Sequence, residues 1–285
     1  MSRTYVVTGA ASGIGLALVA RILDSEPDAD VLALDIAECP DSRARYVRCD
    51  LSDIDSIAAV DLPSRVDALA NVAGVPGTAP AETVLAVNTL GMRALTARVV
   101  KLMPSGSAIV NVASIAAHRS TVHPDAIDDL LAVTDRDGVH QWLAEHPLEG
   151  PAAYDTSKRA VVDWTVRLSA SLQARGVRAN SVSPGPTVTP ILTDFEESMG
   201  VDAIARSQAA VGRHGSAAES AAAVDFLLSP DAAWINGVDI LVEGGLSALR
   251  AASTQPAVVE PDLRPAAAQS RENATSSVSM KGALR

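Results

Sequence analysis

Two residues with acid–base chemistry stand four positions apart in the stretch Tyr154-Asp155-Thr156-Ser157-Lys158. We expect this stretch to open a helix, where side chains at positions i and i+4 lie on one face and can converge on one point. A phenol is a poor base at neutral pH because its pKa is about 10. A neighbouring ammonium favours the phenolate and lowers that pKa. Tyr154 and Lys158 are therefore candidates for an acid–base pair, although this spacing taken alone is more often structural.

Ser114 is a third candidate. It follows the apolar run 108–112 and is expected at the carboxyl edge of a sheet, where open α/β folds bind ligands. Its hydroxyl could hold a carbonyl oxygen beside Tyr154. A serine at a strand end is also a common helix cap, so this residue does not establish a site by itself.

A glycine-rich turn follows the first expected strand, in the order Thr8-Gly9-Ala10-Ala11-Ser12-Gly13-Ile14-Gly15. A helical pattern begins directly after it. Glycines at such a junction permit a tight turn and let the backbone approach a pyrophosphate. The N–H groups of the helix N-terminus then face the negative charge. We therefore expect a dinucleotide here, contacted by Gly9, Ser12, Gly13, Ile14 and Gly15.

Asp35 ends the second expected strand, 20 residues after Gly15. A carboxylate at this position can accept hydrogen bonds from both ribose hydroxyls and repels a 2′-phosphate. Ile36 and Ala37 follow it, so no lysine or arginine flanks it, and Ser12 stands where a basic residue could otherwise meet that phosphate. The pattern favours NAD over NADP. The alternative interpretation of Asp35 is a solvated strand end.

The elements that position these residues alternate along the chain. Short apolar runs predict strands at 4–8, 31–35, 45–49, 67–72, 108–112, 177–182 and 238–242. Helical periodicity predicts helices near 13–24, 54–60, 80–103, 157–175 and 217–229. Such alternation predicts an α/β fold: a single Rossmann-like, doubly wound parallel sheet with helices on both faces.

Composition excludes several classes of protein. The chain has 285 residues, of which 48% are hydrophobic and 20% charged, enough apolar material for a sizeable core. The net charge is −11 and no basic cluster is visible, so we expect no nucleic-acid partner. No apolar run is long enough to cross a membrane, and the N-terminus lacks a secretory pattern. With only Cys39 and Cys49, a cytoplasmic protein is the expectation.

Residues 250–285 differ from the rest, with three prolines and many alanines and serines. We expect one domain over 1–249 and a flexible C-terminal tail over 250–285. An Asn-Ala-Thr sequon in this tail has no use in a chain without a secretory signal.

Taken together, these motifs resemble the short-chain dehydrogenase/reductase family. The resemblance covers nearly all of residues 1–249 and rests on TGAASGIG at 8–15, Asp50 after the third strand, Asn71-Val72-Ala73-Gly74, Asn88, Ser114, YDTSK at 154–158, and Pro184-Gly185 with Thr187 and Thr189. Val72 departs from the family, in which a second asparagine is common.

The resemblance implies a catalytic tetrad of Asn88, Ser114, Tyr154 and Lys158. Tyr154 would be the general acid/base, Lys158 would hold the nicotinamide ribose and tune Tyr154, Ser114 would orient the substrate oxygen, and Asn88 would support a water relay. It further implies that Tyr154 and Lys158 also contact the cofactor. Asp50 and Leu51 would contact the adenine, Asn71, Ala73 and Gly74 would form the floor of the cofactor site, and Pro184, Gly185, Thr187 and Thr189 would hold the carboxamide end.

An insertion near 118–150 separates Ser114 from Tyr154 by 40 residues, more than in most of the family. Apolar residues spaced i, i+3, i+4 predict two short amphipathic helices broken around 135–138. The insertion could cover the family's usual dimer face, form a different dimer, or wall the substrate pocket. We expect a homo-oligomer with an atypical interface. Gly74 and Asn88 are only 14 residues apart, so the helical segment that the family places between them is shortened. The long insertion together with this shortened segment resembles a bacterial subgroup of 3α-hydroxysteroid dehydrogenase/carbonyl reductases.

Residues 190–214 and four histidines each allow two interpretations. Residues 190–214 correspond to a mobile lid in the family, and Ile191, Leu192, Phe195, Met199 and Ile204 give them an apolar face. That face could close over a ring system or simply pack on the core. Four histidines lie at irregular spacing at 118, 123, 140 and 146, and we expect them to be solvated helix residues rather than metal ligands.

The expected function is hydride transfer between NAD and a secondary alcohol or ketone, with a hydroxysteroid or similar apolar alicyclic substrate. A 3-ketoacyl-thioester reductase is the alternative within the fold, but the acidic chain argues mildly against a phosphopantetheine substrate. A non-catalytic NAD-binding sensor is the alternative of another class. It would have no need of the complete set of Ser114, Tyr154 and Lys158.

Overall fold

A seven-stranded parallel sheet forms the centre of the computed structural model, which describes residues 2–199 and 201–253, without the side chains of 195, 196, 198, 199 and 203. The strand order is β3-β2-β1-β4-β5-β6-β9. The strands are β1 (Thr4–Thr8), β2 (Asp30–Asp35), β3 (Arg45–Arg48), β4 (Ala68–Asn71), β5 (Ala108–Val112), β6 (Arg178–Pro184) and β9 (Asp239–Val242). Each lies within a residue or two of an expected strand. The predicted α/β fold is confirmed.

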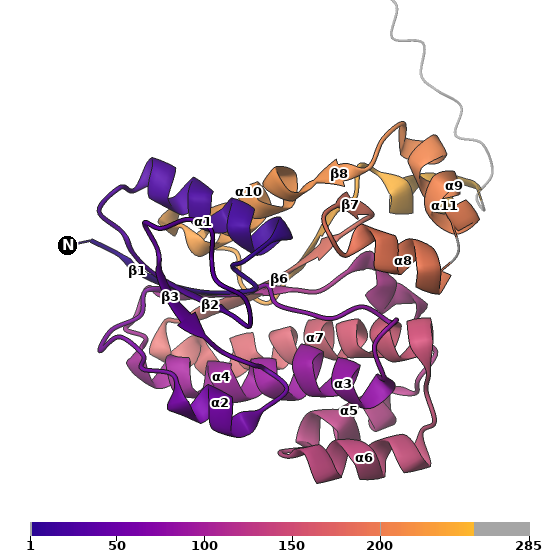
Figure 1. Ribbon diagram of the computed structural model, residues 1–285, viewed down its shortest axis with the longest axis horizontal. Coiled ribbons are helices and arrows are strands. Elements are labelled where there is room, and N and C mark those ends of the chain that lie inside the picture. The colour runs from indigo at the N-terminus through magenta and orange to yellow at the C-terminus, as the bar shows by residue number, and fades with distance from the viewer. Residues whose placement is uncertain (1, 200, 254–285) are drawn as a thin grey trace, which may run out of the picture. The chain divides into compact units, whose positions relative to one another are not determined.

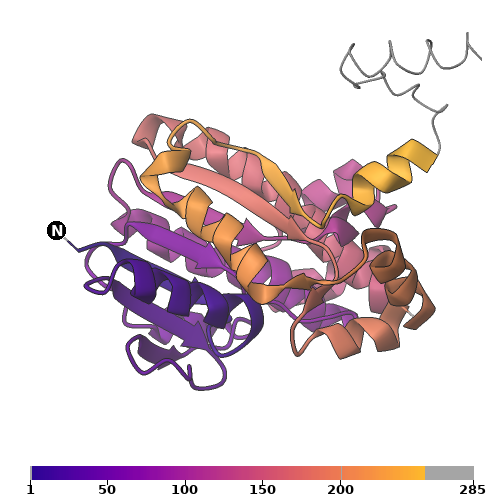
Figure 2. The same ribbon diagram turned by 90° about the horizontal axis from the view of Figure 1, so that it is seen from above.

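Helices cover both faces of the sheet (Figure 1). On one face lie α1 (Gly13–Ser25) and α10 (Ala217–Leu228), which Figure 2 shows side by side. On the other lie α2 (Ile54–Ala59), α4 (Met92–Val99) and α7 (Gly150–Leu172). Alternate strand residues feed the two cores: Tyr5 and Val7 pack under α1, whereas Val6 packs on the opposite side. Strands buried on both faces explain the near-continuous apolar runs.

The segment expected as one helix over 80–103 is interrupted. It consists of α3 (Ala81–Leu85), a π-helical turn (Ala86–Gly91), α4 and a 3₁₀ turn (Val100–Leu102). A π turn adds a residue to the helix and is frequent at functional sites. At Gly91, an added Cβ would lie 1.9 Å from the carbonyl oxygen of Leu51, so only glycine allows this close approach.

The insertion forms α5 (Pro124–Ala132) and α6 (Arg136–Glu145). Their apolar residues pack with residues of α3, the π turn and α7 around a common cluster, and Figure 1 shows them beyond α7. The break lies at 133–135, earlier than the expected 135–138, because the Asp135 carboxylate accepts a hydrogen bond from the Gly138 N–H and caps α6. The insertion therefore covers its own domain's helices.

The remaining elements lie in the last third of the described chain. They are β7 (Thr187–Val188), α8 (Leu192–Met199), α9 (Val201–Val211), β8 (Gly215–Ser216) and α11 (Leu246–Ser253). Ile204 of the expected lid is buried, while the side chains of Phe195 and Met199 lie outside the described residues. The chain divides into a unit Met1–Ser247 and a second beginning at Ala248. From residue 254 on, the predicted tail lies outside the described residues.

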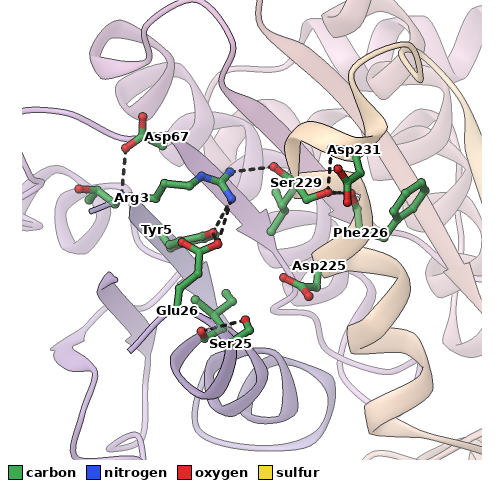
Figure 3. A network of polar contacts seen from close by, with 12 residues as sticks. Arg3, Tyr5, Ser25, Glu26, Asp67, Asp225, Phe226, Ser229 and Asp231 are labelled. Atoms are coloured by element: carbon green, nitrogen blue, oxygen red, sulfur yellow. Dashed lines mark hydrogen bonds and ion pairs between the residues drawn. The ribbon is translucent and has the colours of Figure 1, made fainter. Parts of the chain in front are cut away.

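A polar network closes the amino edge of the sheet (Figure 3). Arg3 donates to the carbonyl oxygen of Leu228 at 2.8 Å and contacts Glu26, and the Tyr5 hydroxyl donates to Glu26 at 2.7 Å. Arg178 donates to the carbonyl oxygens of Leu227 and Ser229. Two guanidinium groups thus satisfy carbonyls at the C-terminus of α10, where cations are favourable.

Candidate active site

A cleft of about 450 Å³ opens at the carboxyl ends of β1, β2 and β4. Of the residues expected to bind a cofactor, Gly9, Ser12, Gly13, Ile14, Gly15, Asp35, Asp50, Leu51, Ala73, Gly74 and Thr189 line it. The other lining residues were not expected as cofactor contacts, although Ile191 was expected in the apolar face of the lid: Thr8, Leu34, Ile36, Cys49, Ser52, Val72, Val75, Thr83, Val87, Pro190 and Ile191. Ile36 and Ser52 adjoin motif residues and could have been found. Val87, in the π turn, directly precedes the motif residue Asn88, whereas Thr83 comes from α3 and belongs to no motif.

The glycine turn is held in place by close backbone packing. An added Cβ at Gly9, which has φ +67°, would lie 2.8 Å from the Ala73 nitrogen. At Gly15 it would lie 2.0 Å from the carbonyl oxygen of Gly9. Ser12 is the N-cap of α1 but makes no side-chain capping hydrogen bond. The backbone of the glycine turn and the N-terminus of α1 are therefore exposed to the cleft without covering side chains. This arrangement fits a pyrophosphate.

The Asp35 carboxylate is fixed from both sides. One oxygen accepts a hydrogen bond from the Ala11 N–H at 3.0 Å and the other from the Ala37 N–H at 3.1 Å. It therefore holds a negative charge beside the glycine turn. Within the part of the chain that the structure describes, no lysine or arginine lines the cleft.

Asp50 and Leu51 border the same cleft beyond Asp35. One Asp50 oxygen accepts hydrogen bonds from the Ser52 N–H and hydroxyl at 2.8 and 2.7 Å. The hydroxyl bond from Ser52 is the main reason why the pKa of Asp50 lies below its ordinary value. A charged acceptor and the apolar Leu51 side by side can hold a base with an exocyclic amine.

Asn71 lies beneath the cleft rather than in its lining. Its buried amide donates to Thr96 at 2.9 Å and to Asn111 at 2.8 Å, which ties β4 to α4 and β5. The floor itself is held by Thr8, whose hydroxyl oxygen accepts hydrogen bonds from the Val72 and Ala73 N–H groups. Asn71 therefore supports the floor from below.

The structure brings Ser114, Tyr154 and Lys158 together. Ser114 is the N-cap of a 3₁₀ element, η3 (Ile115–Arg119), where its hydroxyl oxygen accepts from the Ala116 N–H. The same hydroxyl is hydrogen-bonded to Tyr154. Lys158 Nζ lies 5.7 Å from the centre of the Tyr154 ring. The tyrosine lies in the second turn of α7, which begins at Gly150, earlier than expected.

Burial dominates the protonation of this pair. It raises the pKa of Tyr154 above its ordinary value, and the Ser114 hydrogen bond opposes the rise. It also lowers the pKa of Lys158 to about 8. The sequence predicts that Lys158 lowers the pKa of Tyr154, but the shift has the opposite direction and Lys158 is not among its causes, because burial dominates where both groups are almost fully removed from water.

Asn88 in the π turn links the floor of the site to α7. Its oxygen accepts from the Val75 N–H at 2.9 Å, and its amide donates to the Val75 carbonyl and the Ser157 hydroxyl, both at 3.0 Å. At Gly74, an added Cβ would lie 3.1 Å from the Asn88 oxygen and 3.2 Å from Lys158 Nζ. Asn88 and Lys158 thus meet behind Gly74.

The residues after β6 are divided between the cleft and the core. Pro184 ends β6, and an added Cβ at Gly185 would lie 2.9 Å from Glu243. Thr187 is buried and donates to the Gly185 carbonyl oxygen at 2.8 Å. Thr189 lines the cleft opposite Gly13.

The four histidines of the insertion region lie apart from one another. His123 caps α5, His146 contacts the Trp142 ring, His118 lies 3.9 Å from Asp239, and His140 is exposed on α6. Within residues 2–199 and 201–253, no three His, Cys, Asp or Glu side chains are grouped to hold a metal. A search of the same residues finds no helix with the length and apolar character of a membrane span.

Replacing Lys158 with methionine is expected to remove a pH-dependent stability penalty, against the loss of the hydrogen bond that Lys158 Nζ donates to the buried Val112 carbonyl oxygen at 2.9 Å. The folded pKa of about 8 lies below the ordinary 10.5, so folding disfavours the protonated amine by on the order of 3 kcal/mol below pH 8. That penalty fades as pH rises toward the unfolded pKa. Thermal melts should show Lys158→Met gaining on the wild type at about pH 7 and losing most of the gain by about pH 10. An equal gain from the exposed Lys101→Met would contradict this explanation.

Comparison with known proteins agrees with this geometry. Residues 3–124 match the family model described as short chain dehydrogenase, and residues 141–247 match one described as Enoyl-(Acyl carrier protein) reductase. Coniferyl-alcohol dehydrogenase of Pseudomonas sp. (strain HR199 / DSM 7063) is 34% identical over 249 residues, which cover 86% of this chain and 97% of that protein. Cis-4-hydroxycyclohexanecarboxylate dehydrogenase of Sinomonas cyclohexanicum is 30% identical, with 87% and 97% covered.

A solved structure extends the likeness to three dimensions. The crystal structure of 3-alpha-hydroxysteroid dehydrogenase from Pseudomonas sp. B-0831, complexed with NADH, has a TM-score of 0.73 and 32% identity, covering 88% of this chain and all of that one. The family models, these relatives and the glycine-turn cleft lead to one conclusion: the chain belongs to the short-chain dehydrogenase/reductase family.

Proposed function

We propose that this protein is an NAD-dependent dehydrogenase that interconverts a secondary alcohol and its ketone, with an apolar alicyclic or hydroxysteroid-like substrate. As a member of its family it is an oxidoreductase of alcohol substrates that uses a nicotinamide cofactor. The observation that carries the proposal is the meeting of Ser114, Tyr154 and Lys158 beside the cleft that holds the glycine turn and Asp35.

The preference for NAD rests on Asp35. Two backbone N–H groups hold its carboxylate in the cleft, where it can accept hydrogen bonds from ribose hydroxyls. A 2′-phosphate in the same place would meet a fixed negative charge. The glycine turn and the N-terminus of α1 fit the pyrophosphate, and Asp50 with Leu51 fits the adenine.

The chain's own residues would handle the proton. A bound nicotinamide supplies the hydride acceptor in oxidation and the donor in reduction. Ser114 would hold the substrate oxygen, and Tyr154 Oη would accept the hydroxyl proton in oxidation and return it in reduction. Lys158 would favour the phenolate and hold the nicotinamide ribose. Asn88 would connect this group to water, while Thr187 and Thr189 would hold the carboxamide end.

The surroundings of Tyr154 support an apolar substrate. Its ring packs in a cluster with Val84, Ala116 and Ala153, and Leu148 from the end of the insertion packs against the same cluster. Gly77 and Gly150 approach so closely that a Cβ at Gly77 would lie 2.7 Å from the Gly150 carbonyl oxygen. The insertion's end thus contributes to the wall near Tyr154. The named substrates of the three relatives all carry a ring.

Initial rates with NAD and NADP test the function directly. The panel holds 3- and 20-hydroxysteroids, substituted cyclohexanols, an aromatic allylic alcohol and a 3-hydroxyacyl thioester. NAD-linked turnover of a cyclic alcohol is the expected result. Faster turnover of the thioester would replace the substrate assignment with the reductase alternative. NADH binding without any turnover would instead favour the sensor.

Replacing Asp35 with alanine tests the cofactor preference. Loss of hydrogen bonds between a carboxylate and the ribose is expected to reduce the NAD/NADP ratio of kcat/KM by about 10- to 100-fold. Asp30→Ala removes an exposed carboxylate from the other end of β2 and serves as control. An Asp35→Ala enzyme with the wild-type ratio would remove the basis for NAD.

The proposed assembly is a homo-oligomer with an atypical interface. The insertion helices occupy part of the surface of α3 and α7. Association would therefore use another face, and Trp234, which is 99% exposed near β9, offers apolar surface there. A monomeric mass by light scattering would contradict this assembly.

A further inference from the structure

An ion pair adjoins Tyr154 that no motif of the site explains. The Arg119 guanidinium donates to both Asp155 oxygens, from Nε at 3.0 Å and from Nη2 at 2.7 Å. Asp155 is only 8% exposed and directly follows Tyr154 in α7. Arg119 is the last residue of η3, the element that Ser114 caps. The pair therefore joins the element that carries Ser114 to the helix that carries Tyr154.

We propose that Arg119 and Asp155 are positioning residues. They hold the Ser114 hydroxyl and the Tyr154 phenol at the distance and orientation that the reaction requires, and their opposite charges balance each other around the phenol. This inference rests on the proposed dehydrogenase function. It assigns a task to two residues that the family's motifs do not require.

Geometry is the first support. A planar guanidinium that binds a carboxylate through two parallel bonds fixes orientation as well as distance. Ser120, next to Arg119, adds a second tie, because its hydroxyl lies 3.2 Å from that of Thr156. The long insertion begins directly after η3. The contacts of Arg119 and Ser120 with α7 therefore fix η3, and with it Ser114, independently of the position of residues 121–149.

Charge is the second support. Among the side chains that the structure describes, the charged groups that act on Tyr154 include Arg119 from η3 and Asp155 and Lys158 from α7. The loop after β4, α3 and the end of the insertion contribute apolar side chains to its surroundings. Asp155 raises the pKa of Tyr154 and Arg119 lowers it, so the two charges of the pair act on the phenol in opposite directions. Removal of one member should leave the other unbalanced.

Opposite shifts in the pH profile are the expected result. In the oxidation direction kcat/KM rises with pH as the base form of Tyr154 appears. Arg119→Gln should move that limb to higher pH, and Asp155→Asn to lower pH, each by about half to one unit. Both single variants should also lose about tenfold or more in kcat, because the reacting groups lose register. The double variant should return the limb to its wild-type position.

Two further variants separate charge from geometry and guard against misfolding. Arg119→Lys keeps the charge but not the paired donors, so it should keep the limb while losing kcat. Asp163→Asn breaks a comparable Arg159–Asp163 pair one turn beyond Lys158 and should change neither quantity. If Arg119→Gln does not fold, the Asp155→Asn and Arg119→Lys pair still decides the question.

The pKa of Tyr154 can be measured without any substrate turnover, so this test does not depend on the proposed function. Ultraviolet titration of phenolate, with each variant compared with its Tyr154→Phe derivative, reports the Tyr154 pKa even if no alcohol is oxidised. Opposite shifts for Arg119→Gln and Asp155→Asn support the inference. Shifts of the same sign, or none with only a lower melting temperature, would show the pair to be a structural tie and overturn it.

Discussion

Replacing Tyr154 with phenylalanine is expected to reduce kcat with any alcohol substrate by on the order of a thousandfold. The phenol oxygen is the group that the geometry presents for proton transfer, hydrogen-bonded to Ser114 and beside Lys158. Phenylalanine keeps the ring and its packing with Val84, Ala116 and Ala153, so the fold should not change. Because the cleft lining lies on other residues, NADH affinity should change little.

Steady-state rates and a fluorescence titration with NADH measure the two quantities on one preparation. Tyr5→Phe is the matched control: it removes a phenol from the polar network at the amino edge and should lower stability without lowering kcat. A Tyr154→Phe enzyme with more than about a tenth of wild-type kcat would show that another group moves the proton. If the Tyr154→Phe protein kept its effect in cells without oxidising any alcohol, the NAD-binding sensor would be favoured.

Local patterns were enough to predict the sheet and about half of the residues that line the cleft. A short apolar run predicts each strand. Because parallel strands have their carboxyl ends at one edge of the sheet, the residues that follow them, Gly9, Asp35, Asp50 and Gly74, are expected to lie in one cleft. Helical spacing likewise put Tyr154 and Lys158 on one face. These features depend on local periodicity and on a topology with few alternatives.

Features that depend on tertiary contact escaped prediction. The π turn that holds Asn88 ends at Gly91, which packs against the Leu51 carbonyl, and no sequence spacing reveals that contact. Burial, not the Tyr154–Lys158 spacing, sets the direction of both pKa shifts. The Arg119–Asp155 pair joins residues on either side of the insertion, and its bonds are visible only once η3 lies on α7.

Replacing Gly15 with alanine is expected to weaken NADH binding by about 10- to 100-fold for each backbone hydrogen bond to phosphate that is lost. The added Cβ would lie 2.0 Å from the Gly9 carbonyl oxygen and 2.6 Å from its carbon, both backbone atoms without a rotamer to change. Gly9 cannot move away, because it already lies against Ala73. The N-terminus of α1 must therefore shift, and with it the N–H groups that face the pyrophosphate.

The same displacement should lower the free energy of unfolding by about 1–3 kcal/mol, which chemical denaturation measures. Gly106→Ala is the control: Gly106 has φ +90°, but an added Cβ there meets nothing within 4 Å. It should cost stability through backbone strain while leaving NADH affinity unchanged. If Gly15→Ala bound NADH as tightly as Gly106→Ala, the turn would not hold the pyrophosphate. The cofactor would then have to be held mainly by Asp35, Asp50 and the floor at Gly74, which also bring fixed polar groups to the cleft.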